Sequence, residues 1–388
     1  MGNAYEWKPG SDAVVSALAD ARAVAAEHAA EVDADARFPE EAVAALARGG
    51  LLGLCVSRQH GGVGEGPRGF AAVVEELAAA CGSTAMVYVM HVTAAQAIAQ
   101  SSTLAGRDAL LAQIAAGKHF TTLAFSEKGS RSQFWAPVSR LAEAGDGYTT
   151  DAKKSWVTSA VRADSYVSSA QAPRAASPLE STCYLARRGA AGVKVAGAWN
   201  GLGLRGNESA PVDIAGLRVA RGDLMTEPGK GADMMLQVVL PWFSIGTAAM
   251  ANGLCRASVA ATTQHLCGAG FEHLGTKLRD LPNLRTRLAR MNLKTELACS
   301  LLARTISAME SPSETTPLFV LQTRLASLDA ALEVTDLAMK TCGGAAFSRH
   351  LPVERVFRDA RAGWVMAPTA DHLEEFLGRA LTGLPLFG

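Results

Sequence analysis

Two side chains near the middle of the chain have the types and the spacing of a binding surface. In the run Lys154-Ser-Trp-Val-Thr-Ser-Ala160, Trp156 and Thr158 are two residues apart. In a strand this spacing places both side chains on one face. The pair would present an aromatic surface and a hydroxyl to a cofactor, and it equally fits an ordinary barrel tryptophan beside a paired threonine.

A glycine pair and a charged segment follow near the C-terminus. Gly343 and Gly344 let a backbone come close to a ligand, and they are also typical of a helix end. Arg358, Asp359 and Arg361 predict an ion-paired segment with a structural role, because such pairs serve packing as often as chemistry.

Metal chemistry and disulfides are not indicated. The seven cysteines are scattered, with no Cys-x-x-Cys pair and no histidine cluster at ligand spacing, so we expect no metal site. Scattered thiols and an N-terminus without a signal-peptide pattern predict a cytoplasmic protein.

The composition excludes several classes of protein. Lys plus Arg and Asp plus Glu both number 37, and this balance argues against a nucleic-acid binder. Apolar residues make up 49% of the chain and charged residues 19%, which excludes a disordered chain. The most apolar segment, 234–255, contains Gln237, Pro241 and Asn252, so it predicts a buried helix rather than a membrane span.

Three zones differ in their pattern, and we predict domains at 1–120, 121–228 and 229–388. The first is rich in Ala and Leu with helical periodicity, and its run PEEAVAALAR stops at a Gly-Gly. The second alternates in short runs between turn formers and predicts an antiparallel β domain. In the third, 284–309 and 317–341 predict two long helices of a bundle.

Several motifs then resemble the acyl-CoA dehydrogenase family over nearly the whole chain. LAFSEKGSRS stands in the place of the family's T-E-P-x-x-G-S loop, and KSWVTSAVRADSYVSSAQ in that of K-x-W-I-T-N-A-x-x-A-D. CGGAAFSRHLPVERVFRDAR is similar to H-G-G-x-G-Y-x-x-x-x-P-V-E-R-x-x-R-D-A-R. The long match PVER-x-x-RDAR is the most specific of these.

The resemblance implies an α+β fold with an N-terminal helical domain, a middle antiparallel β-barrel domain and a C-terminal four-helix bundle. It implies an FAD-dependent oxidoreductase that acts on an acyl thioester of CoA or of a carrier protein. The electron acceptor would be an electron-transfer flavoprotein or oxygen, and the assembly a homodimer or homotetramer.

The resemblance also implies which residues meet the cofactor and the substrate. Trp156 would pack on the flavin, and Thr158 would hydrogen-bond near its reactive nitrogen. The other cofactor positions are Phe125, Ser126, Ser132, Lys340, Gly343, Gly344 and Thr369. The substrate positions are Arg131, Ser132, Met366 and Ala367. The chain departs from the family at Phe271, where an arginine normally meets the cofactor phosphates, and Lys340 could supply a substitute charge.

The residue that normally removes the α-proton of the substrate is missing. The family's base is the Glu of Tyr-Glu-Gly-Thr, and here the same frame reads Met366-Ala367-Pro368-Thr369. The second family position, in the first bundle helix, falls in VVLPWFSIGTAAMANG, which contains no acid. Asp371, Glu374 and His91 are the weak candidates for a replacement base, against the ordinary roles of a helix N-terminal acid and a core histidine.

Three hypotheses remain open. Another residue could act as the base, or the flavin chemistry could be oxygenation, elimination or desulfination, or the chain could be a non-catalytic subunit of a heteromeric dehydrogenase. We favour a flavin-dependent oxidoreductase on an acyl thioester, with Ala367 where the base normally stands.

Overall fold

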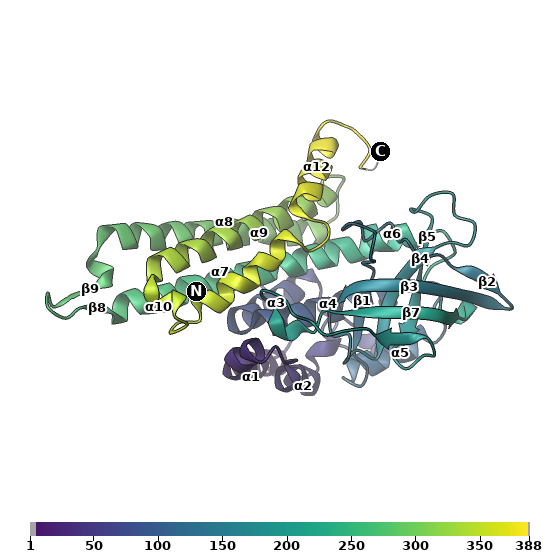
Figure 1. Ribbon diagram of the computed structural model, residues 1–388, viewed down its shortest axis with the longest axis horizontal. Helices are drawn as coiled ribbons and strands as arrows, with labels where there is room; N and C mark the ends of the chain where they lie inside the picture. The colour runs from purple at the N-terminus through teal and green to yellow at the C-terminus, as the bar shows by residue number, and fades with distance from the viewer. Residues whose placement is uncertain (1–4, 387–388) are drawn as a thin grey trace.

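The protein is described by a computed structural model over residues 5–386, in which two helical regions flank a region of strands (Figure 1). This order of helices, strands and helices is the order that the sequence predicts. The long helices of the C-terminal region extend away from the strands and give the molecule an elongated shape.

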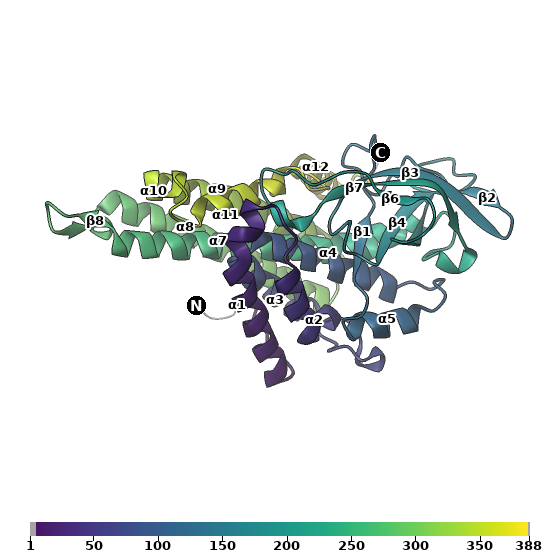
Figure 2. The same ribbon diagram turned by 60° about the horizontal axis from the view of Figure 1, so that its bottom comes forward.

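Between residues 5 and 120 the N-terminal region contains five α-helices, and the fourth of them is buried along almost its whole length. The helices are α1 (Asp12–Ala34), α2 (Glu40–Arg48), α3 (Pro67–Ala80), α4 (Gly82–Ala99) and α5 (Arg107–Ala115). Because α4 has no charged side chain apart from His91 when it is protonated, it can be covered on all sides. It contacts both the bundle helix α7 (Leu240–Gly268) and the first strand, and so lies at the junction of the three regions (Figure 2).

The middle region forms two sheets. Its strands are β1 (Thr121–Ala124), β2 (Ala142–Ala144), β3 (Gly147–Val157), β4 (Ser165–Gln171), β5 (Ser181–Arg187), β6 (Val193–Val195) and β7 (Ala210–Val219). The sheet orders are β1-β4-β5 and β2-β3-β7-β6. The prediction of a purely antiparallel region is wrong for β1, which pairs in parallel with β4. Between β1 and β4 the chain forms the β2–β3 hairpin, which belongs to the other sheet. This long connection allows β4 to run in the same direction as β1.

The C-terminal region is built on three long helices. They are α7, α8 (Pro282–Glu310) and α9 (Thr316–Cys342), and the two helices predicted at 284–309 and 317–341 are confirmed. The shorter helices are α6 (Gly231–Met234), α10 (Gly344–Phe347), α11 (Val353–Ala360) and α12 (Ala370–Leu381). A π-helical segment, Met235–Val239, joins α6 to α7, and a hairpin of β8 (Gly270–Phe271) and β9 (Thr276–Lys277) follows α7.

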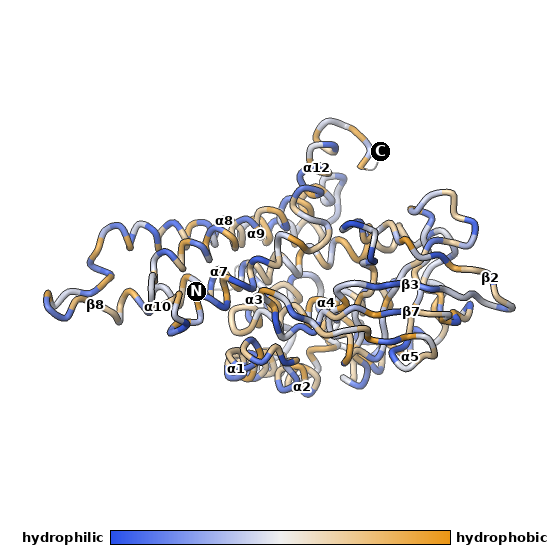
Figure 3. The backbone as a smooth tube through the Cα atoms, viewed as in Figure 1, coloured by the Kyte–Doolittle hydropathy of each residue, from blue (hydrophilic) through white to orange (hydrophobic). Residues whose placement is uncertain are grey.

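Burial explains the apolar character of these helices. The stretch Gly231–Gly268 is long and apolar enough to cross a membrane by length and composition, but 67% of its most apolar window is buried inside the protein. Core helices of folded proteins show this pattern, in agreement with the prediction of a buried helix. Along α8, hydrophilic and apolar residues alternate (Figure 3), as in a helix that buries one side only.

Candidate active site

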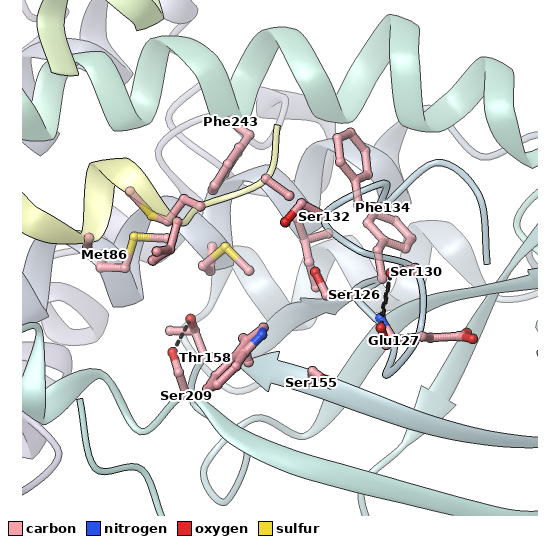
Figure 4. A pocket seen from close by; sticks show the side chains of 18 of the residues that line it. Met86, Ser126, Glu127, Ser130, Ser132, Phe134, Ser155, Thr158, Ser209 and Phe243 are labelled. Carbon is pink, nitrogen blue, oxygen red and sulfur yellow. Dashed lines mark hydrogen bonds between the residues drawn. The ribbon is translucent and has the colours of Figure 1, made fainter. Parts of the chain in front are cut away.

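A cavity of about 810 Å³ opens where the three regions meet. In Figure 4, Phe243 of α7 lies on one side of it and Thr158 and Ser209 on the other. Met86 of α4 closes one end, and Ser126 and Ser132 lie toward the opposite end. Its walls include the predicted site residues Phe125, Ser126, Arg131, Ser132, Trp156, Thr158, Met366 and Ala367.

A buried ion pair anchors the loop that follows β1. Glu127 accepts a hydrogen bond of 2.6 Å from Lys154 Nζ, and both side chains are almost fully buried. The Val138 N–H and the N–H and hydroxyl of Ser139 also donate to Glu127. Burial would raise the pKa of Glu127, but Lys154 and these donors hold it below its ordinary value. The loop that carries Ser126 and Ser132 is therefore tied to β3 by a fixed charge pair.

Trp156 reaches the cavity through a bulge and not by simple strand alternation. The pairing of β3 with β7 shifts between Lys154 and Val157, and Trp156 has a positive φ of 58°. The predicted alternation of Trp156 and Thr158 along one strand is therefore wrong, because Thr158 lies beyond the end of β3. Both side chains nevertheless line the cavity, as predicted. The Trp156 indole is 66% exposed and meets Trp199 edge to face.

Two hydroxyls are paired on the same wall. Thr158 Oγ1 and Ser209 Oγ are 2.9 Å apart and both are buried. Neither Asn207 nor Ser209, which also line this wall, was singled out from the sequence. The only feature that could have indicated Asn207 and Ser209 is their place directly before β7, the strand that pairs with β3.

The opposite part of the cavity is apolar. Met86 and Met90 of α4, Phe243 of α7 and the segment with Met366 and Ala367 form this wall. Side chains of this kind suit an acyl chain. Of these residues, only Met366 and Ala367 could be predicted from the sequence, because the others lie on helix faces with the pattern of ordinary core.

No free carboxylate lines the cavity in residues 5–386. Glu127 is the acid on its wall, and it is held by Lys154. Asp371 and Glu374 lie on the exposed side of α12 and do not reach the cavity. These two candidates for a replacement base are therefore wrong, because the buried side of α12 is formed by Leu373 and Phe376 instead.

His91 belongs to the core and not to the cavity. The Thr121 N–H donates to its Nδ1, and its Nε2 donates to the Leu52 carbonyl at 3.1 Å. Its ring stacks on Phe120, with centroids 4.7 Å apart. Burial lowers the pKa of His91 to about 4, so the neutral ring is the stable form. His91 is wrong as a candidate base, and the ordinary core interpretation holds.

This histidine should make the protein sensitive to acid. The folded pKa of about 4 lies below the unfolded value of about 6.5, so stability is lost as the pH falls through this window. Between pH 7 and pH 5 we expect His91 to account for a loss of about 2 kcal/mol in the free energy of unfolding. In His91→Gln, urea unfolding at both pH values should show a loss smaller by this amount, and equal losses would contradict the assignment.

The prediction of an ion-paired segment near the C-terminus is confirmed for Arg358 and is wrong for Asp359 and Arg361, which form other contacts in the described residues. Arg358 forms ion pairs with Asp33 and Glu354, and Arg361 donates to Thr335 Oγ1 at 2.9 Å. Asp359 accepts the Leu204 N–H at 2.6 Å, and burial raises its pKa to about 7. These contacts fix α11 against the N-terminal and middle regions, next to the cavity wall.

Comparison with known proteins identifies the family. The model of the acyl-CoA dehydrogenase N-terminal domain matches residues 13–118, and that of the C-terminal domain matches residues 229–381. Together they cover most of the chain. The chain belongs to the acyl-CoA dehydrogenase family.

Relatives and solved structures agree with this assignment. The short-chain specific acyl-CoA dehydrogenase of Bos taurus mitochondria is 26% identical over 344 residues, which cover 88% of this chain and 82% of the relative. The butyryl-CoA dehydrogenase structure from Megasphaera elsdenii has a TM-score of 0.89 at 22% identity, covering 96% of this chain and 98% of its own. The FAD complex of PigA has a TM-score of 0.87 at 19% identity, covering 96% and 97%.

The cofactor of this family is FAD, and the cavity fits it. An exposed indole and a pair of hydroxyls on one wall suit a flat, polar-edged ring system. In the described part of the chain, neither the Ser126 nor the Ser132 hydroxyl has a hydrogen-bond partner within the protein, so both are available to a ligand. Bound FAD would supply hydride or electron transfer.

The remaining predicted cofactor residues do not reach this cavity. Lys340 is exposed and pairs with Asp336 at 2.6 Å, while Gly343 ends α9 with a positive φ of 56°. With Gly344 they lie near α10, at the end of the bundle away from the strands (Figure 1). Thr369 precedes α12, where its hydroxyl is 3.0 Å from His372 Nδ1. Their roles toward FAD stay predictions, and for the glycines they require a neighbouring subunit.

Trp156→Ala should weaken cofactor binding without destabilising the apoprotein. The exposed indole contributes little to the core, whereas a stacked aromatic contact is worth about tenfold in affinity. We expect the FAD dissociation constant, measured by fluorescence quenching, to rise by about this factor. The thermal unfolding temperature of the apoprotein should stay unchanged. Trp156→Phe, which keeps a ring, should bind FAD nearly as wild type; equal binding by Trp156→Ala would contradict the assignment.

Proposed function

We propose that the chain is an FAD-dependent oxidoreductase of an acyl thioester whose reaction does not use a protein carboxylate at position 367. The observation that carries this proposal is the cavity wall at Ala367. A methyl group stands where the family places its base, and the one acid that lines the cavity in the described residues is held by Lys154.

The chain's own residues would divide the work as follows. Trp156 and the Thr158 hydroxyl would hold and orient the cofactor ring, and Ser126 and Ser132 would supply further hydroxyls at its edge. Met86, Met90 and Phe243 would hold the acyl chain and exclude water from it. No described side chain on this wall would accept an α-proton, which favours oxygenation away from the α-carbon, or a desulfination or other elimination in which the leaving group departs without loss of the α-proton.

The competing hypothesis of a non-catalytic subunit is less well supported. A chain that only lends contacts to a sister subunit has no need for its own cavity. Here the cavity has about 810 Å³, and the exposed indole and the paired hydroxyls remain on its wall. These features favour a subunit that binds its own cofactor and substrate.

We further propose that the protein works as a homodimer or homotetramer, with CoA or a carrier protein as the handle of the substrate. Two large apolar side chains that line the cavity, Trp156 and Val365, are exposed in the single chain, and so are Leu202 and Trp364. A neighbouring subunit would cover them. The acceptor of electrons would be oxygen or an electron-transfer flavoprotein.

The visible spectrum of the purified protein tests the proposal. A yellow protein whose colour persists on anaerobic mixing with straight-chain acyl-CoAs is the expected result. Bleaching by these thioesters would show that dehydrogenation proceeds without a carboxylate at position 367. A colourless preparation that takes up no added FAD would support the non-catalytic subunit.

A further inference from the structure

A positive charge without a counter-ion in the described residues lies behind the apolar wall of the cavity. Arg324 of α9 has no exposed surface and is among the largest fully buried side chains. Its Nη2 donates to the Met366 carbonyl at 3.0 Å. Its Nε and Nη1 have no hydrogen-bond acceptor in this part of the chain. Buried arginines are normally paired with a carboxylate, so this arrangement needs an explanation.

The surroundings of Arg324, as far as the structure describes them, contain no compensating charge. One turn away on either side along α9 stand Val320, Leu321, Ser327 and Leu328. Burial is the sole cause that lowers the pKa of Arg324, to about 9, and no acid within residues 5–386 counteracts it. At neutral pH the guanidinium therefore stays charged, and its field extends through a region of low dielectric.

This field reaches the cavity at Ala367. The guanidinium lies 4.9 Å from the centre of the Phe243 ring, and its hydrogen-bond partner Met366 directly precedes Ala367. Phe243, Met366 and Ala367 all line the cavity. The charge is thus one layer of atoms behind the wall on which the usual base would stand.

A glutamate at position 367 would offset this charge, and alanine does not. The other charged residues that line the cavity in residues 5–386 are Glu127, held by Lys154, and the cations Lys128 and Arg131. Two cations therefore line the cavity, and the charge of Arg324 lies behind its apolar wall. Compared with glutamate, alanine also leaves the volume of a carboxymethyl group free on the wall that Phe243 and Met366 line.

We propose that the substrate itself supplies the missing anion: the acyl group of the thioester carries a carboxylate close to its α-carbon, attracted by Arg324 across the wall at Ala367. This inference rests on the proposed function, because it takes the thioester to lie in the cavity with its α-carbon near position 367. Arg324 would select the substrate without touching it, so it is a specificity-determining residue and not a catalytic one.

The test compares two thioesters of nearly equal shape. In malonyl-CoA a carboxylate follows the α-carbon, and in 3-methylbutanoyl-CoA an isopropyl group of similar volume takes its place. If the two charges are taken to be about 8 Å apart at an effective dielectric of about 20, the attraction favours the anion by roughly thirtyfold, and desolvation of the carboxylate reduces this. We expect the FAD-loaded protein to bind malonyl-CoA about tenfold more tightly in a flavin-absorbance titration.

Two variants separate charge from shape. Arg324→Gln should abolish the preference, and Arg324→Lys should retain most of it. Should both prove unstable, the comparison of Ala367→Gln with Ala367→Glu gives an independent test. Ala367→Gln fills the same space without adding charge, so it should weaken binding of both thioesters and keep the preference for malonyl-CoA. Ala367→Glu adds a charge of the wrong sign for malonyl-CoA and should reverse the preference.

The outcomes distinguish this inference from the proposed function. Equal binding of both thioesters, or tighter binding of the neutral one, would overturn the role of Arg324 and leave the proposed function standing. A wild-type preference for malonyl-CoA that survives in Arg324→Gln and in Ala367→Glu would also overturn it. Binding of neither thioester by the yellow protein would overturn the proposed function and this inference together.

Discussion

Ala367→Glu is expected to give the protein acyl-CoA dehydrogenase activity, or to raise any trace of it by about 100-fold or more. The measurement is the rate at which the visible absorbance bleaches on anaerobic mixing with a neutral acyl-CoA. The expectation follows from the surroundings of position 367, which form an apolar wall of the cavity without a proton acceptor.

The new carboxylate would be ionised and therefore able to accept a proton. The Arg324 guanidinium donates to the carbonyl of the preceding residue and has no acid of its own in the described residues. It would hold the pKa of the introduced carboxyl below the value expected for such a group in an apolar wall. A general base in position contributes about 10²- to 10⁴-fold to proton transfer, and this range sets the size of the expected gain.

Ala367→Gln is the matched control, because it has the same shape and no basic oxygen. It should bind FAD as wild type and remain inactive toward neutral acyl-CoAs. If Ala367→Glu binds FAD and a neutral acyl-CoA but does not bleach, the α-carbon is not directed at this position. The substrate would then lie in another orientation in the cavity.

The sequence predicted the parts of the fold that depend on local pattern. The segments of α8 and α9 contain no internal Pro or Gly and keep one apolar face, so their extents could be predicted to within about two residues. The parallel pairing of β1 with β4 could not, because it depends on where the chain returns after the β2–β3 hairpin.

The motif residues predicted part of the site. The residues and geometry that depend on contacts between distant parts of the chain could not be predicted in this way. Trp156 was assigned to the right wall by the wrong geometry, since a positive φ at a tryptophan has no signal in the residue type. The sequence around Arg324 also indicates that this residue is buried. Its neighbours one turn away are apolar or carry hydroxyls, which places it on a buried helix face.

Breaking the Glu127–Lys154 pair should cause the largest loss of stability among single changes at the cavity. The two residues are 27 positions apart in the sequence, and they join the loop after β1 to strand β3. Lys154 also donates to the Ser169 carbonyl at 2.7 Å, so three segments meet at one ammonium group. Removing it leaves the Glu127 carboxylate buried without its counter-ion.

Lys154→Met should therefore lower the free energy of unfolding by about 3–5 kcal/mol, the usual cost of an uncompensated buried charge. The double variant Glu127→Gln/Lys154→Met should recover part of this loss, because it no longer buries a lone charge. Arg174→Ala removes the exposed pair with Glu143 and should leave urea unfolding unchanged. A Lys154→Met protein as stable as Arg174→Ala would contradict the anchoring role.

The same pair predicts a dependence of stability on pH. The folded pKa of Glu127 is depressed, so its contribution is present above the unfolded value of about 4.3 and should be lost in wild type as the pH falls below that value. The double variant, which has no Glu127 carboxylate, should not lose stability in this way. Because the same loop carries Ser126 and Ser132, Lys154→Met should also bind FAD more weakly.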